Sequence, residues 1–322
     1  MSTHQFAKLT PDFILSAIEN LGFWCDARIY PLNSYENRVY QVGIEDKPTL
    51  IAKFYRPHRW TKTQILEEHT MLLNLKKANL SVIAPIAIEG NTLFSYDGFD
   101  FCLYDKQLGQ APEADNMDHL FSTGELLGQM HNLMQKTRYQ TRPTMHPIDD
   151  FEHAFESVLA SVHMPKSVKS IFPTLHQKLH SLITNNINHY WPTTLYPIHA
   201  DCHRSNLLIN QEQLYILDFD DSKTGPAVQD LWLHLSGAIE QQRQQLSELI
   251  EGYESYNPFD SQELKLIDSL KACRLIQYAA WLDNRWSDPA FPLAFPWFKA
   301  EDYWLNLAND LQTIIKDWGK LA

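Results

Sequence analysis

The chain has 322 residues, of which 44% are hydrophobic, 12% aromatic and 20% charged, and this composition excludes a disordered or fibrous protein. The 27 basic and 39 acidic residues give a formal net charge of −12, which opposes nucleic acid and anionic membranes as partners. The four cysteines form no CxxC pair, residues 1–10 show no export signal, and no stretch approaches the ~20 apolar residues of a membrane span. We expect a cytoplasmic, monomeric protein with reduced thiols.

Strand patterns dominate the first hundred residues. Thr10 and Pro11 precede apolar residues at helical spacing, which predicts an opening helix as far as Ile18. Runs of β-branched and aromatic residues between turn formers predict five strands, at 28–32, 38–42, 49–55, 92–96 and 99–104, the last two joined by an Asp97-Gly98 turn. Residues 60–75 predict a helix with a threonine cap. The pattern indicates a sheet with one helix against it.

Helical spacing dominates beyond about Gln110. It predicts helices at residues 118–134, 230–251, 261–281 and 302–318. Because strand-rich sequence gives way to helix-rich sequence near residues 101–109, we predict an α+β protein with two lobes, 1–104 and 105–322. The aromatic segment 281–304 permits two interpretations, core packing under an irregular loop or a wall beside a substrate cleft.

The segment 198–221, IHADCHRSNLLINQEQLYILDFDD, carries the strongest chemical signal. Asn206 follows Asp201 by five positions, and Asp218 lies twelve further on. Two short apolar runs flanking a polar turn separate Asn206 from Asp218, which predicts a β-hairpin that brings these two residues together. This spacing fits the catalytic-loop pattern of kinases.

These residue types suit phosphoryl transfer. The reaction needs a carboxylate to receive the proton of the acceptor hydroxyl and oxygen ligands for Mg²⁺. We expect Asp201 to be the base, Asn206 and Asp218 to be metal ligands, and His199 to support the loop through hydrogen bonds. The alternative is that an Asp and an Asn merely satisfy backbone groups in a turn.

The chain resembles the aminoglycoside phosphotransferase and choline kinase group, which shares the bilobal protein-kinase-like fold. Further segments resemble a branch of this group regarded as cytoplasmic ATP-dependent serine/threonine kinases of stress responses. These segments are PLNSYENRVY (31–40), KFYRPHRW (53–60), QILEEH (64–69), EADN (113–116), GPAVQDLW (225–232) and DPAFPLAFPW (288–297). The resemblance implies an enzyme that uses ATP and Mg²⁺ to phosphorylate serine or threonine hydroxyls of proteins.

The resemblance also implies roles in the N-terminal lobe. Lys53 matches the lysine that contacts the α and β phosphates, and Ser34 matches the phosphate-facing loop. Glu68, on the following helix, is expected to pair with Lys53, with Glu67 as the competing choice. Asp230 is expected to accept backbone hydrogen bonds from the catalytic loop or, alternatively, to act as a carboxylate at a helix N-terminus.

Three features depart from the pattern of the group. The loop 33–38 contains no glycine, Ala200 stands where glycine is usual, and Asp220 and Asp221 follow where a glycine is expected. The added carboxylates bind a second ion or raise the local negative charge; we favour the latter. Two further functions therefore stay open: a small-molecule kinase acting on an alcohol or amino alcohol, and a weakly active nucleotide-binding regulator.

Overall fold

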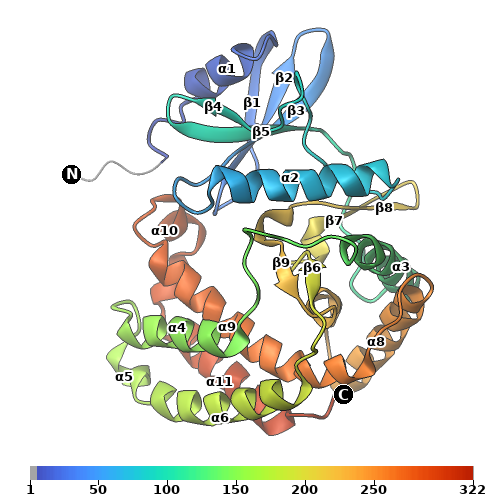
Figure 1. Cartoon of the computed structure of the whole chain (residues 1–322). Helices are drawn as coiled ribbons and strands as arrows, with labels where there is room; N and C mark the ends of the chain where they lie inside the picture. Colours follow the sequence, from blue (N-terminus) through green and yellow to red (C-terminus); the bar gives the residue numbers. More distant parts are fainter. Residues whose placement is uncertain (1–5, 322) are drawn as a thin grey trace.

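The structure, a computed structural model, describes residues 6–321, so the first five residues of the N-terminal segment lie outside it. The N-terminal part is a five-stranded antiparallel sheet with the strand order β1-β2-β3-β5-β4. Its strands are β1 (Cys25–Pro31), β2 (Arg38–Ile44), β3 (Lys47–Phe54), β4 (Phe94–Tyr96) and β5 (Phe99–Asp105). Figure 1 shows this sheet above a mainly helical remainder. The predicted α+β, protein-kinase-like architecture is confirmed, whereas the division into lobes after residue 104 stays a prediction.

Local signals explain the first elements. Helix α1 (Pro11–Glu19) begins where predicted because the Thr10 side chain accepts a hydrogen bond of 3.3 Å from the Phe13 amide. The apolar face of α1 packs against the sheet. Strands β4 and β5 meet at Asp97 and Gly98, whose φ angles of 40° and 90° suit a type I′ turn. The predicted hairpin is therefore confirmed.

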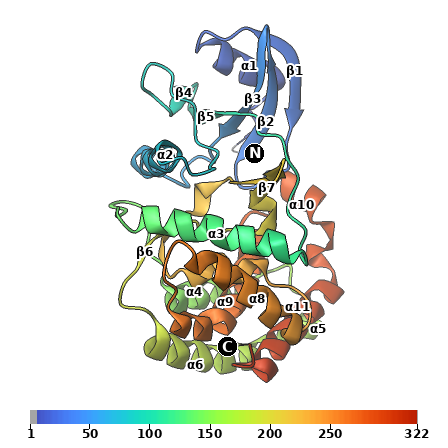
Figure 2. The ribbon, with the colours of Figure 1, turned by 90° about the vertical axis from the view of Figure 1, so that its right-hand side faces the viewer.

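Helix α2 (Lys62–Lys77) connects the sheet to the helical part. It starts after Thr61, which forms a reciprocal capping box with Gln64. Its residues Met71, Leu72 and Leu75 share one core cluster with apolar side chains of the later hairpin of β7 (Leu207–Asn210) and β8 (Gln213–Ile216). Figure 2 shows α2 at the level where the sheet meets the helices. Ile65 of α2 also packs with Cys102 of β5, so α2 joins the sheet to the hairpin.

The remainder is mainly helical. Its helices are α3 (Met117–Met134), α4 (Pro147–Ala160), α5 (Lys166–Lys169), α6 (Phe172–Tyr190), α7 (Val228–Leu231), α8 (Ile239–Glu254), α9 (Ile267–Asn284), α10 (Ala290–Ala294) and α11 (Glu301–Asp317). Two small sheets interrupt them, β6 (Tyr196–Ile198) with β9 (Lys223–Gly225), and β7 (Leu207–Asn210) with β8 (Gln213–Ile216). Among residues 6–321, no helix has the length and apolar character needed to cross a bilayer.

Two predicted helices need correction. The segment 230–251 is not one helix, because α7 ends at Leu231 and α8 begins only at Ile239. Gly237, with φ of 80°, turns the chain between them. The segment 261–281 begins as a 3₁₀-helix over Ser261–Leu266, and α9 then continues to Asn284.

The aromatic segment 281–304 serves both predicted purposes. Phe291, Phe298 and Trp304 are fully buried in the largest core cluster of the helical part. Trp281, by contrast, lines the large cleft between the sheet and the helices. Packing therefore accounts for most of the segment, and its first residue reaches the cleft.

Candidate active site

The backbone of the loop after β6 is held by a buried carboxylate. Asp230 is fully buried, and its two oxygens accept hydrogen bonds of 2.8 and 2.7 Å from the amides of His199 and Ala200. His131 contributes a third contact, 2.9 Å from Nε2 to Asp230 Oδ2, and also contacts the Tyr253 hydroxyl. The prediction that Asp230 accepts backbone hydrogen bonds from the loop is confirmed. Both carboxylate oxygens of Asp230 are thus hydrogen-bonded in a fully buried position.

The predicted hairpin forms and sets the distance between two candidate metal ligands. β7 and β8 pair so that the Leu217 amide donates to the Asn206 carbonyl oxygen at 3.0 Å. The Asn206 side-chain amide donates to the Asp201 carbonyl oxygen at 2.9 Å, which fixes the rotamer of Asn206. His199 Nε2 lies 2.9 Å from the Leu217 carbonyl oxygen, so His199 supports the loop as predicted. Asp218 follows in the left-handed region with φ of 61°.

Lys53 reaches this hairpin from β3. Its Nζ lies 2.9 Å from Asp218 Oδ1 and 3.1 Å from Asp220 Oδ1, and the side chain is only 5% exposed. Burial alone lowers the pKa of Lys53, but the two carboxylates raise it well above its usual value. The ammonium group therefore stays charged between two acids.

The predicted Lys53–Glu68 ion pair is wrong for this structure. Both residues are described, and no salt bridge joins them; Glu68 Oε2 instead lies 3.1 Å from Arg142 Nη1. Arg142 Nε also donates to the carbonyl oxygen of Ser222 at 2.7 Å, so its guanidinium joins α2 to the segment after the hairpin. Glu68 is buried, and its Oε1 has no hydrogen-bond partner. The carboxylate therefore keeps one unfilled acceptor behind Lys53.

Glu67, the competing choice for the Lys53 partner, has a different environment. Its Oε2 accepts hydrogen bonds from the backbone amides of Thr141 and Arg142 at 3.0 and 2.9 Å. Glu67 thus holds the loop that carries Arg142 and points away from Lys53.

The two acids after Asp218 are paired. Arg59 forms ion pairs with Asp220 and with Asp221, the latter at 2.6 Å. Burial raises the pKa of Asp220, but Arg59 and Lys53 outweigh that effect and hold it below its usual value. We predicted that these acids would add negative charge; in the structure, cations largely compensate it.

The loop between β1 and β2, which contains Ser34, is held by contacts with the helical part. Ser34 Oγ donates to the Asn37 carbonyl oxygen at 3.1 Å and closes the turn in place of a glycine. Glu36 Oε2 accepts a hydrogen bond of 2.7 Å from Trp281 Nε1, and Glu36 Oε1 lies 2.8 Å from Arg285 Nη2. These contacts tie the loop to α9.

A second set of contacts joins the same region to the segment before α10. Asp288 is 4% exposed, and its Oδ2 lies 2.7 Å from Arg38 Nη2 and 2.9 Å from Arg56 Nη2. The Tyr35 and Phe295 rings pack at a centroid distance of 4.8 Å. The sequence did not predict that Asp288 pairs with Arg38 and Arg56, although two arginines occur together at residues 56–59.

The candidate base is also paired. Asp201 Oδ1 lies 2.6 Å from Arg274 Nη1 of α9, and Asp201 Oδ2 lies 3.6 Å from His203 Nε2. Asp201 Oδ1 is buried, and the Arg274 guanidinium is its charged neighbour. Burial is the main cause that lowers the pKa of His203, which favours its neutral form. The sequence carried no local signal for Arg274.

One cleft of about 810 Å³ collects most of the predicted site residues. The members that line it are Ser34, Lys53, Asp201, Asn206 and Asp218, whereas Glu68 lies behind the wall. A volume of this size accommodates a nucleotide-sized ligand. The lining includes the carboxylates of Asp201 and Asp218 and the side-chain amide of Asn206, whose oxygens form a donor set that fits Mg²⁺.

The N-terminal sheet packs above a mainly helical part, and Asp201, Asn206 and Asp218 lie around the β7-β8 hairpin at the cleft between them. This arrangement defines a kinase-like phosphotransferase fold. Residues 28–267 match the family model described as "Phosphotransferase enzyme family", and the chain belongs to this family. The stress response kinase A of Escherichia coli K12 is 41% identical over 305 residues, covering 95% of this chain and 92% of the relative. A relative from Salmonella typhimurium, named serine/threonine protein kinase RdoA, is 40% identical and covers 93% and 90%.

Solved structures share the fold at low sequence identity. The amicoumacin kinase hAmiN, solved with AMP-PNP, Ca²⁺ and its ligand, superposes with a TM-score of 0.71 at 18% identity, covering 93% of this chain and 94% of that chain. The choline kinase LicA of Streptococcus pneumoniae superposes with a TM-score of 0.63 at 15% identity, covering 95% and 99%.

Proposed function

We propose that this protein is an ATP- and Mg²⁺-dependent kinase that phosphorylates serine or threonine hydroxyls of proteins in the cytoplasm during a stress response. The observation that carries the proposal is the convergence of Asp201, Asn206, Asp218 and Lys53 on one cleft. The relatives near 40% identity bear names of stress response and serine/threonine kinases, which supports a protein acceptor.

In this proposal each cleft residue has one task. Asp201 accepts the proton of the acceptor hydroxyl, and Asn206 and Asp218 hold the metal. The metal, when bound, neutralises charge that develops on the phosphate oxygens. Lys53 contacts the α and β phosphates, and Ser34 faces the phosphates from its turn.

Lys53 has two acidic partners at this site. Its Nζ lies 2.9 Å from Asp218 Oδ1 and 3.1 Å from Asp220 Oδ1. If Asp218 held a metal ion, Asp220 would still pair with Lys53, so Lys53 would not become an unpaired buried charge.

The acceptor side of the cleft supports a protein substrate over a cationic amino alcohol. The face of α9 toward the cleft carries Leu270, Cys273, Arg274, Gln277, Tyr278 and Trp281, and none of them is acidic. Its charged member, Arg274, lies beside the base. A fixed positive charge there disfavours a cationic acceptor and favours a hydroxyl near an acidic or neutral group.

The test uses the purified full chain with labelled Mg-ATP, followed by identification of phosphorylated residues. Wild type is expected to yield phosphoserine or phosphothreonine, on itself or on proteins of its own cell. Asp201→Asn is expected to abolish the transfer, and Asp310→Asn, an exposed aspartate on α11, serves as the matched control. If Asp201→Asn still transfers labelled phosphate, Asp201 is not the general base.

The second candidate is a small-molecule kinase. It is favoured by the cleft volume of about 810 Å³ and by solved structures of similar fold that are named as kinases of amicoumacin, aminopropanol and choline. A panel of alcohols and amino alcohols, phosphorylated far faster than any protein, establishes it. Mg-ATP that raises the melting temperature without any transfer instead indicates a nucleotide-binding regulator.

A further inference from the structure

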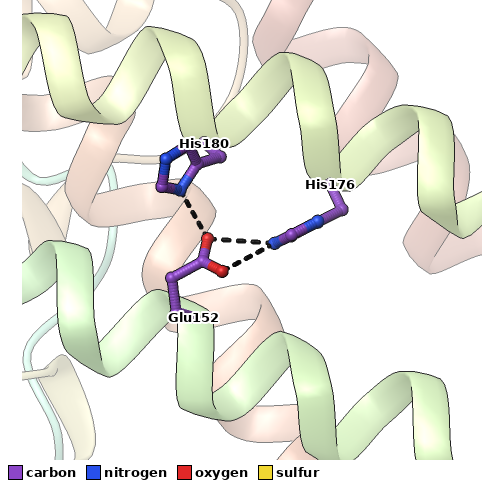
Figure 3. Close-up of side chains that lie close together, drawn as sticks. All are labelled: Glu152, His176 and His180. Atoms are coloured by element: carbon purple, nitrogen blue, oxygen red, sulfur yellow. Dashed lines mark hydrogen bonds and ion pairs between the residues drawn. The ribbon is translucent and has the colours of Figure 1, made fainter.

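A cluster of two histidines and one glutamate lies in the helical part, and none of the three residues lines the cleft. Glu152 comes from α4, and His176 and His180 come from successive turns of α6 (Figure 3). His176 Nε2 lies 2.9 and 3.0 Å from the two Glu152 oxygens, and His180 Nδ1 lies 2.5 Å from Oε1. Within residues 6–321, this is the one group of His, Cys, Asp and Glu side chains whose ligand atoms converge in this way.

The spacing of the ligands follows from the helix. Residues four apart lie on one face of a helix, so His176 and His180 project together toward α4. Figure 3 shows both rings directed at the same carboxylate. The three ligand atoms lie within 4.8 Å of one another, and a metal with bonds of about 2.0–2.1 Å places its ligand atoms roughly 3.3 Å apart. Small side-chain rotations therefore suffice to admit an ion.

Buried aromatic packing holds the site in place from one side. The His176 ring stacks on Phe151 at a centroid distance of 5.9 Å and contacts Phe155 at 4.8 Å. Both phenylalanines are fully buried, so they restrict the His176 ring. The His180 side chain is 45% exposed, which gives an ion and its water ligand a path from solvent.

We propose that Glu152, His176 and His180 bind a divalent transition-metal ion, with Zn²⁺ as the best match. Two imidazole nitrogens and one carboxylate oxygen, with a position left for water, form a donor set typical of zinc. Mg²⁺ and Ca²⁺ prefer oxygen ligands and are excluded by the same argument. Because the ligands come from two helices, the ion cross-links α4 to α6 and stabilises the helical lobe.

The proposal is tested by titrating the metal-free full chain with Zn²⁺ and Co²⁺ in the presence of saturating Mg²⁺ and ADP, which occupy the oxygen ligands of the cleft. Wild type is expected to bind one equivalent of Zn²⁺ at micromolar concentration and to melt at a higher temperature. Bound Co²⁺ is expected to show the intense visible absorption of a four- or five-coordinate nitrogen–oxygen site.

Three variants separate this site from any other. Glu152→Gln and His180→Gln are expected to weaken Zn²⁺ binding by at least about tenfold and to abolish the Co²⁺ band. His189→Gln, an exposed histidine later on α6, is the matched control and keeps both. Circular dichroism and melting without metal verify that each variant is folded. Binding that is equal in wild type and Glu152→Gln, or no saturable binding at micromolar metal, overturns the proposal.

Discussion

The two ends of the cleft are built in different ways. At the hairpin end, residues 198–221 obtain most of their geometry from neighbours close in sequence, such as the Asn206 contact with the Asp201 carbonyl oxygen. At the loop end, residues 32–37 obtain theirs from residues some 250 positions away, since Glu36 contacts Trp281 and Arg285. Local spacing thus defines the candidate base and metal ligands, and tertiary packing defines the loop opposite them.

If the comparison is right, the largest single loss of activity comes from the hairpin end. Asp218→Asn removes the charge that the proposed metal ligand supplies, and several kcal/mol of charge stabilisation corresponds to a loss of about 10³-fold or more in kcat. The measurement is steady-state transfer of label from Mg-ATP. The matched change Asp221→Asn, at the partly exposed partner of Arg59, is expected to cost no more than a few fold. Equal losses in both variants contradict the role of Asp218.

The support that Asp230 gives to the hairpin end produces the next effect. In Asp230→Asn, an amide NH₂ replaces one of the oxygens that accept from His199 and Ala200, which leaves a buried N–H without an acceptor. An unmet buried donor costs about 1–3 kcal/mol, so the free energy of unfolding falls by about that amount. Urea denaturation measures it, with Asp310→Asn as the control. An unchanged unfolding midpoint shows that the loop does not depend on Asp230.

The features that the sequence predicted are mostly those set by local spacing, and the features that it missed are set by tertiary packing. The hairpin and the α1 and α2 caps depend on short spacings and were predicted, whereas the Asp230 contacts were expected from the family resemblance. The partner of Lys53 was not, because Arg142 reaches Glu68 from a loop whose position no local pattern encodes. Arg274, which touches the candidate base from α9, was missed for the same reason.

At the loop end, a change should act on nucleotide binding more than on the chemical step. Glu36→Gln weakens the contacts with Arg285 and Trp281, which removes a charge-assisted interaction worth about 1.5–3 kcal/mol at most. The freed loop samples more conformations, so KM for ATP is expected to rise roughly tenfold with kcat nearly unchanged. Glu45→Gln, an exposed glutamate of the same lobe, is the control. A fall in kcat at constant KM instead assigns Glu36 to the chemical step.

The smallest effect tests the strain within the hairpin end itself. Ala200 has φ of 69°, a left-handed conformation that costs a non-glycine residue about 1–2 kcal/mol. Ala200→Gly relieves this strain but adds freedom to the unfolded chain, which costs about 0.5–1 kcal/mol. The net gain in the free energy of unfolding is therefore expected to stay below about 1 kcal/mol, with kcat within about twofold, because Asp230 still holds the residue 200 amide.

Urea denaturation and steady-state turnover of Ala200→Gly measure these two quantities. If the free energy of unfolding falls by more than about 1 kcal/mol, the packing energy of the buried Ala200 methyl group exceeds the strain energy of its backbone. A large drop in kcat with unchanged stability shows that the strain itself orients Asp201. The departure from glycine is then part of how this site works, since only a restricted backbone at residue 200 limits the directions in which the next carboxylate points.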